Sequence, residues 1–233
     1  LGHPNIYIKD ERQGPTGSFK DRQAAIAISV MKEAGIKEAV VSSTGNVAIA
    51  YSAYSARAGI KMWVFVTSSV PSDKMREVAL YGSEVIKVAG TYDEAKRIAA
   101  EFATSKNLFL DRGVKGIAAK EAMKTLAFEI AEQLGNALAG EHTAVLNSNH
   151  PWRTPDWYLQ AVSGGLGPVG VMKGFAELKR LGLVEKLPKL GLFQTSGCAP
   201  MANSFRKRLP EAAAVKEPRT DITTHDIGER GGV

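Results

Sequence analysis

The sequence has little of the chemistry that disulfides and metal sites require. Its single cysteine, Cys198, excludes an internal disulfide and a CxxC metal site. The four histidines lack the spacing of metal ligands, so no metal is expected; they are His3, His142, His150 and His225. No apolar run reaches membrane-spanning length and no signal-peptide pattern is present. We therefore expect a cytoplasmic protein with no membrane partner.

Charge of one sign is in only slight excess. The chain carries 30 Lys and Arg against 24 Asp and Glu, a net charge of +6 over 233 residues. The two signs are interspersed without a basic block, so nucleic acid is not an expected partner, whereas small anions are. Hydrophobic residues make up 44% of the chain, enough for a substantial core. The chain opens without methionine and closes abruptly, which suggests a piece of a longer protein.

Strand-like runs alternate with helical segments along most of the chain. The strand-like runs are 38–43, 61–66, 83–89, 107–111, 157–162 and 190–195. Helical spacing covers 19–35, 47–58, 72–81, 92–105, 117–134 and 169–181. Glycines that follow helical runs are expected as left-handed C-caps, namely Gly35, Gly59, Gly82, Gly135 and Gly182. The alternation predicts an α/β fold with parallel sheets and right-handed crossovers.

The stretch "GPTGSFKDRQAAIAIS" places Lys20 where a turn meets a helix. Gly14, Pro15, Gly17 and Ser18 are turn residues, and the alanine-rich run after Lys20 has helical spacing. The partial positive charge of a helix N-terminus disfavours a charged ammonium. A neutral amine is what attacks a carbonyl to form a Schiff base, although most single lysines are simply exposed.

Two further strand-to-helix turns are rich in polar residues or glycine. In "SSTGNVAIAYSAYSARAGI" (42–60) a strand ends in hydroxyl groups, and Asn46 offers a donor and an acceptor close to a helix start. Either this turn holds an anion or its polar residues are an ordinary helix cap. In "AVSGGLGPVGVMKGF" (161–175) the glycines allow successive N–H groups to approach a phosphate. A plain turn is the alternative there.

A lysine, a strand-end asparagine and a glycine-rich loop together suit an aldehyde cofactor with a phosphate arm. The combination "PTGSFKDR", "SSTGN" and a later glycine-rich loop resembles the fold-type-II pyridoxal-phosphate enzymes, and threonine synthases most of all. The resemblance extends to "MKTLAFEIAEQLG", "PDWYLQAV", "KGFAELKRLGL" and "QTSGCAPMANSF", and so covers nearly all of the chain.

The resemblance assigns a role to each motif. It implies pyridoxal 5′-phosphate as the cofactor, with Lys20 as both its Schiff-base partner and the proton shuttle. It implies that Asn46 bonds the ring hydroxyl. The phosphate then lies against Ser163, Gly164, Gly165, Leu166 and Gly167. The substrate α-carboxylate is assigned to Ser43, Thr44 and Gly45.

The resemblance also implies two open α/β subdomains, truncated at both ends. Residues 36–112 form the smaller one, and 1–35 with 113–233 form the larger, cofactor-carrying one. The aperiodic stretch 136–151 is expected as a surface insertion within the larger subdomain. The serine or threonine that faces the pyridine nitrogen in the family is not located in this sequence.

The implied activity is that of a lyase of amino-acid biosynthesis acting on a small amino acid. It eliminates phosphate from O-phosphohomoserine and adds water to give threonine. The arginine run that grips the substrate phosphate in threonine synthases is replaced here by "DRGVKGIAAKEAMKT" (111–125). Lys115 or Lys120 is the expected substitute, ahead of Arg112.

Two alternatives remain open at the level of sequence. A threonine or serine dehydratase needs the same cofactor site without a grip on phosphate. A truncated, non-catalytic homologue would only bind a ligand or a partner. The oligomeric state is also open, with a homodimer as the assembly considered.

Overall fold

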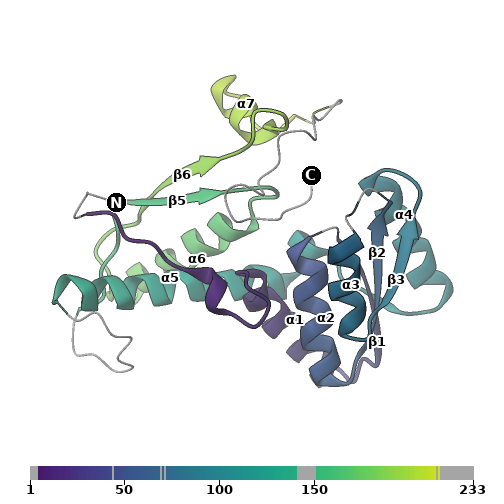
Figure 1. The fold of residues 1–233 in the computed structure, drawn as a ribbon. Helices are drawn as coiled ribbons and strands as arrows, with labels where there is room; N and C mark the ends of the chain where they lie inside the picture. The colour runs from purple at the N-terminus through teal and green to yellow at the C-terminus, as the bar shows by residue number, and fades with distance from the viewer. Residues whose placement is uncertain are drawn as a thin grey trace.

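The computed structural model describes residues 5–43, 45–68, 70, 72–140, 151–213 and 215. Strands and helices alternate along the chain (Figure 1), as the sequence predicts. Within the described residues, no helix is both long and apolar enough to cross a membrane. The same residues contain no group of three or more His, Cys, Asp or Glu side chains that could hold a metal ion.

Four parallel strands form the first sheet. They are β1 (Glu38–Ser42), β2 (Lys61–Thr67), β3 (Glu84–Val88) and β4 (Phe109–Leu110), in the order β3-β2-β1-β4. The strands are short and mostly apolar because helices cover both faces of the sheet. The α/β fold class with parallel strands is thereby confirmed.

The two faces of this sheet are buried under different helices. The helices α1 (Lys20–Glu33), α2 (Asn46–Ala58) and α3 (Ser72–Leu80) cover one face, and α4 (Tyr92–Ser105) covers the other (Figure 1). Successive side chains of β1 alternate between them: Val41 packs towards α1 and α2, whereas Val40 packs with α4. This alternation buries the strand on both sides.

The remaining elements form a second layer. The long helix α5 (Ile117–Leu138) packs on α6 (Leu166–Arg180) beneath a parallel pair of strands, β5 (Trp157–Ala161) and β6 (Lys189–Phe193). The short elements are η1 (Glu11–Gln13), η2 (Gly113–Lys115) and α7 (Pro200–Arg206). Glycines bring α5 and α6 close, since a Cβ on Gly174 would lie 2.7 Å from the Cβ of Ala127.

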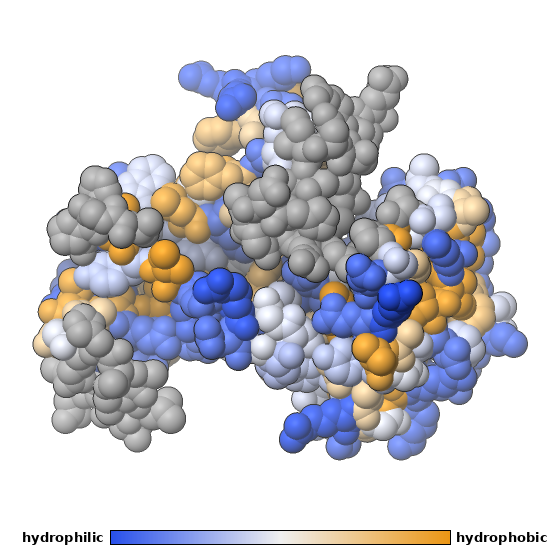
Figure 2. Space-filling model, viewed as in Figure 1, coloured by the Kyte–Doolittle hydropathy of each residue, from blue (hydrophilic) through white to orange (hydrophobic). Residues whose placement is uncertain are grey.

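The outer face of the β5–β6 pair is uncovered in the part of the chain that the structure describes. Tyr158 points towards the α5–α6 core, which places Trp157 and Leu159 on the opposite face. Trp157, Leu159 and Phe193 are 55%, 62% and 57% exposed. Figure 2 shows hydrophobic residues at the surface on this side of the molecule.

Helix α1 joins the two layers and lies between α5 and α2 in Figure 1. Its apolar face, with Ala27 and Ile28, belongs to the core of the first sheet. Towards α5 the contact is ionic: the guanidinium of Arg22 donates to the carboxylate of Glu129 at 2.6 Å and to Thr125 Oγ1 at 2.9 Å. The division at residues 35/36 into two subdomains stays a prediction.

Two expectations about individual segments differ from the structure, and one helix was not expected. Gly135 is not a C-cap, because α5 continues to Leu138. The first residues of the expected insertion are therefore helical, and Asn136 is buried; residues 141–150 lie outside the described residues. The helix α7 was not predicted from the sequence.

Candidate functional site

The order of the strands places a topological switch point between β1 and β4. The chain runs from β1 outwards to β2 and β3, and then returns to place β4 on the other side of β1. Ligands of open α/β sheets bind beyond the carboxyl ends of the strands at such a reversal. Here Ser43 follows β1 and Asp111 follows β4, so both residues lie at this switch point.

A tight turn leads directly into Lys20. Gly17 N–H donates to the carbonyl of Gly14 at 3.0 Å, and Gly17 has a φ of 68° that only glycine adopts easily. Ser18 Oγ accepts from the backbone N–H of Lys20 at 3.3 Å. Lys20 is the first residue of α1, half-buried, and its Nζ lies 4.0 Å from the centre of the Phe19 ring. The predicted junction of turn and helix is therefore present.

The β1–α2 turn has the expected polar residues at the strand end. Asn46 is the first residue of α2 and is half-buried. Ser43 is buried, and its Oγ accepts from the N–H of Gly45 over a long 3.4 Å. The N-cap position is Gly45, and within the described residues no side chain caps this helix. Thr44 lies outside the described residues.

The glycine-rich loop opens at the start of α6. Ser163 and Gly164 are exposed, and Gly165 has a φ of 75° immediately before the helix. Among the described residues no side chain caps this helix, so its first N–H groups can receive an anion. Leu166 and Gly167 lie in the first turn, where a Cβ on Gly167 would sit 2.6 Å from the side-chain amide of Gln160.

A buried polar network ties the first two of these regions together. Gln23 Nε2 donates to the hydroxyl of Tyr51 at 3.1 Å, and that hydroxyl donates to Asp111 Oδ2 at 3.1 Å. Gln23 lies one turn beyond Lys20, and Tyr51 lies five residues beyond Asn46. The starts of α1 and α2 are therefore on the same side of the helix pair, next to the switch point.

Burial shapes the electrostatics of this network. Burial raises the pKa of the Asp111 carboxyl, against the lowering effect of hydrogen bonds from Gly113 N–H and Tyr51. Burial and the charge of Asp111 also raise the pKa of the Tyr51 phenol, so its hydroxyl stays a donor. Gln23, Tyr51 and Asp111 were not predicted from the sequence as site residues. The one sequence feature that could have indicated a site residue among these three is the position of Asp111 at the end of an apolar run.

The loop at 163–167 is linked to Lys20 through apolar packing. Phe19, the neighbour of Lys20, packs against the cluster that contains Leu166 and Phe175. The first turn of α5 lies between the two layers, because Ala118 packs with the first core and Ala119 with the second.

The basic residues of the 112–120 segment have mixed exposure. Lys115 is exposed at the end of η2, Lys120 is half-buried in the first turn of α5, and Arg112 is exposed. Within the described residues none of the three forms an ion pair. The start of α5 also lacks a side-chain cap. This segment can therefore receive an anion, which leaves the expectation for Lys115 and Lys120 open.

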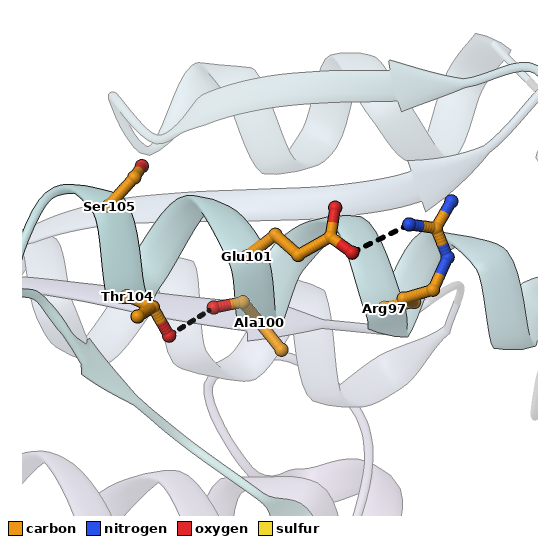
Figure 3. A pocket seen from close by; sticks show the side chains of 5 residues that line it. All are labelled: Arg97, Ala100, Glu101, Thr104 and Ser105. Atoms are coloured by element: carbon orange, nitrogen blue, oxygen red, sulfur yellow. Dashed lines mark hydrogen bonds and ion pairs between the residues drawn. The ribbon is translucent and has the colours of Figure 1, made fainter.

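Two surface hollows are present, one away from the candidate site and one at its edge. One, of about 420 Å³, is lined by Arg97, Ala100, Glu101, Thr104 and Ser105, all from α4 (Figure 3). None of these is a candidate residue, and Arg97 already pairs with Glu101. The other, of about 480 Å³, lies between the N-terminal segment, α1 and α5, and includes Ser18, Asp21 and Arg22. It borders the turn in front of Lys20.

The fold and the candidate site together define a class of protein. This is a parallel α/β protein with an amine at one helix start, an amide at a second and a glycine cradle at a third. The chain belongs to the family described as pyridoxal-phosphate dependent enzymes, whose family model matches residues 1–231. The expected cofactor, pyridoxal 5′-phosphate, is that of the family.

Curated relatives match nearly all of this chain. Threonine synthase of Methanocaldococcus jannaschii is 32% identical over 229 residues, which cover 98% of this chain and 52% of the relative. Threonine synthase of a Synechocystis species is 33% identical over 210 residues, covering 90% and 50%. The chain thus spans about half the length of the curated relatives it matches.

Solved structures share the fold at lower identity. Maize serine racemase superposes with a TM-score of 0.70 at 19% identity, covering 91% of this chain and 56% of that one. Threonine deaminase isoform 2 from Solanum lycopersicum gives a TM-score of 0.69 at 22% identity, covering 87% and 50%.

The residues present fit the cofactor of the family. The uncapped start of α6, opened by Gly164 and Gly165, offers N–H groups without a bulky side chain in front of them. A phosphate suits such a start. Lys20 offers the amine that a cofactor aldehyde requires, and Asn46 offers an amide at the neighbouring helix start.

Proposed function

We propose that this chain carries the cofactor site of a threonine synthase-like lyase of amino-acid biosynthesis. The reaction is elimination of phosphate from O-phosphohomoserine and addition of water to give threonine. The observation that supports this most is the identity of about a third to threonine synthases, over nearly the whole chain. The lysine at the start of α1 is consistent with it.

Each candidate residue has a role in this proposal. When bound, pyridoxal 5′-phosphate supplies an electron sink for carbanions next to the substrate nitrogen. Lys20 holds the cofactor through its Nζ and then moves protons with the same atom. Asn46 donates to the ring hydroxyl, and the N–H groups of 163–167 bind the phosphate arm. Ser43, Thr44 and Gly45 receive the substrate carboxylate.

We assign the leaving phosphate of the substrate to the start of α5. Lys115 and Lys120 flank the uncapped N–H groups there, and neither forms an ion pair within the described residues. Two ammonium groups and a helix N-terminus together attract a dianion. Localisation in the cytoplasm and assembly as a homodimer stay predictions.

The cofactor lysine is tested by chemical labelling. Borohydride reduction of the cofactor-loaded protein, followed by peptide mapping, is expected to leave the cofactor on Lys20. A label on another lysine would contradict the role of Lys20. The absence of any label on cofactor-bound protein would favour the non-catalytic, ligand-binding alternative.

The reaction is tested by product analysis. The cofactor-loaded full-length protein is incubated separately with O-phosphohomoserine, threonine and serine. Threonine and inorganic phosphate from the first substrate are the expected products. Release of ammonia and a keto acid from threonine or serine, with no turnover of the phosphorylated substrate, would indicate the dehydratase instead. The dehydratase stays a candidate because the arginine run that grips the substrate phosphate in threonine synthases is replaced in this chain.

The phosphate grip is tested by removing one charge at a time. Loss of a charge-assisted contact of about 1.5–3 kcal/mol should slow turnover of O-phosphohomoserine about ten- to a hundredfold in Lys115→Ala or Lys120→Ala. Turnover of an unphosphorylated hydroxy amino acid should barely change. Lys87→Ala, at an exposed position on β3, is the control. If neither variant distinguishes the two substrates, this segment does not bind the phosphate.

A further inference from the structure

Asp21, directly after Lys20, is a charged residue that folding has buried. The residue is only 6% exposed in the first turn of α1. Both carboxylate oxygens accept hydrogen bonds from Thr16: one from the backbone N–H at 3.0 Å, the other from the hydroxyl at 2.7 Å. Burial of a carboxylate costs free energy unless hydrogen bonds compensate, so these two bonds keep Asp21 in place.

The bonds of Asp21 hold the turn that precedes Lys20. A Cβ on Gly14 would collide with the Asp21 carboxylate, so glycine at that position lets the side chain fold back over the turn. Thr16 lies in the same turn, which the bond from Gly17 N–H to Gly14 C=O closes. Asp21 therefore fastens the start of the helix to the turn before it, and Lys20 lies between the two.

The neighbouring Arg22 has a different task. It spans from α1 to Glu11 and to Glu129 on α5, and so joins separate elements. The hydrogen bonds of Asp21 span only five residues and join no elements. They therefore act only on the backbone around Lys20. A reactive amine needs a backbone that is held in one position.

We propose that Asp21 is a positioning residue for Lys20, an inference that rests on the proposed role of Lys20 in holding the cofactor. With the turn fastened, the backbone at Lys20 cannot rotate, and the amine approaches a bound aldehyde from one direction. Without the carboxylate, the turn at 14–18 loosens and the amine reaches the aldehyde less often. A misplacement of about 1 Å can cost about a hundredfold in rate.

The test separates the amine from the rest of the cofactor site. Attachment joins Lys20 Nζ to the aldehyde carbon and releases the aldehyde oxygen as water. Its rate is followed after mixing the apo-protein with pyridoxal 5′-phosphate, and borohydride trapping with peptide mapping identifies the lysine. Pyridoxine 5′-phosphate lacks the aldehyde, so its dissociation constant reports the phosphate and ring contacts alone.

Asp21→Ala is expected to slow attachment to Lys20 at least tenfold and to change the affinity for pyridoxine 5′-phosphate less than threefold. Asp21→Asn should restore most of the rate, because its amide can accept from the Thr16 N–H and donate to the Thr16 hydroxyl. Thr16→Val removes one of the two hydrogen bonds and should give an intermediate rate. It also serves as the test if Asp21→Ala does not fold.

Asp93→Ala is the matched control, since Asp93 is also in the first turn of a helix but its side chain is 92% exposed. An attachment rate in Asp21→Ala and Thr16→Val equal to that of the parent overturns the inference. Equal losses of attachment rate and pyridoxine 5′-phosphate affinity also overturn it, because they indicate general disruption. If the parent itself is not labelled on Lys20, the proposed function fails first, and this inference fails with it.

Discussion

The two sheets of the molecule differ in how completely they are covered. The four-stranded sheet is buried on both faces, and Phe65 at its centre is 1% exposed. Within the described residues, the β5–β6 pair is covered by α5 and α6 on one face only, and Phe193 on it is 57% exposed. Parallel sheets are normally covered on both faces. The first sheet is thus covered on both faces, whereas the second presents an apolar face in the part of the chain that the structure describes.

This difference bears on how the candidate site is built. Asn46 begins α2, and Tyr51 of this helix belongs to the core of the first sheet. Helix α1 shares that core through Ala27 and Ile28. The glycine-rich loop follows β5, one face of which is uncovered by the described residues. A cofactor bridging Lys20 and this loop would span both layers, so its affinity depends on both.

The largest expected effect contrasts two phenylalanines on strands. Phe65→Ala removes a fully buried ring and should lower the free energy of unfolding by about 3–5 kcal/mol. Phe193→Ala removes an exposed ring and should change it by less than about 1 kcal/mol. Urea unfolding of both variants gives the comparison. Similar losses would mean that the outer face of β5–β6 is buried in solution.

The layout of the fold was predictable because local patterns determine it. All six strands in the described residues were predicted to within about two residues at each end, since strand and helix periods differ clearly. Six helices were predicted to within about four residues at each end, whereas α7 was not predicted. The end of α5 was missed because Gly135, normally a helix terminator, is tolerated where the backbone of Pro151 packs against it. Tertiary contact overrode local propensity there.

The candidate site was predictable only in part. Lys20 and the loop at 163–167 were recognisable because turn residues and glycines have local meaning. The network of Gln23, Tyr51 and Asp111 was not, because its members are 28 and 60 residues apart in sequence and meet only through packing. A buried polar residue cannot be recognised in the sequence until its hydrogen-bond partner is known.

The second prediction concerns this network, whose Tyr51 belongs to the core of the first sheet. Tyr51→Phe leaves Asp111 Oδ2 and Gln23 Nε2 without their shared partner in a buried site, so the free energy of unfolding should fall by about 1–3 kcal/mol. Tyr54→Phe, a half-buried position on the same helix, is the control and should change it by less than about 0.5 kcal/mol. Thermal unfolding of both variants decides. Equal stability of Tyr51→Phe and the parent would mean that the network adds nothing to the core.

The smallest expected effect concerns the ionic joint between the two layers. Burial raises the pKa of Glu129, but hydrogen bonds from Arg22 and Lys9 outweigh this and lower it from 4.5 to about 2. The unfolded chain therefore binds more protons than the folded one between these values. The stabilisation is complete above pH 4.5 and is lost as the pH falls towards 2. Because Glu129 is partly exposed, solvent screening reduces it to about 1 kcal/mol.

Glu129→Gln should remove this pH-dependent part of the stability. The variant is expected to be less stable than the parent at pH 7 by about 1 kcal/mol, with the two converging as the pH approaches 2. Glu101→Gln, in the exposed pair with Arg97 on α4, should follow the parent at every pH. Urea midpoints measured from pH 7 to pH 2 test this. A constant difference across the range would show that Arg22 joins α1 to α5 by packing rather than by charge. The contact of α1 with α5 would then be of the same kind as its apolar contact with the first sheet.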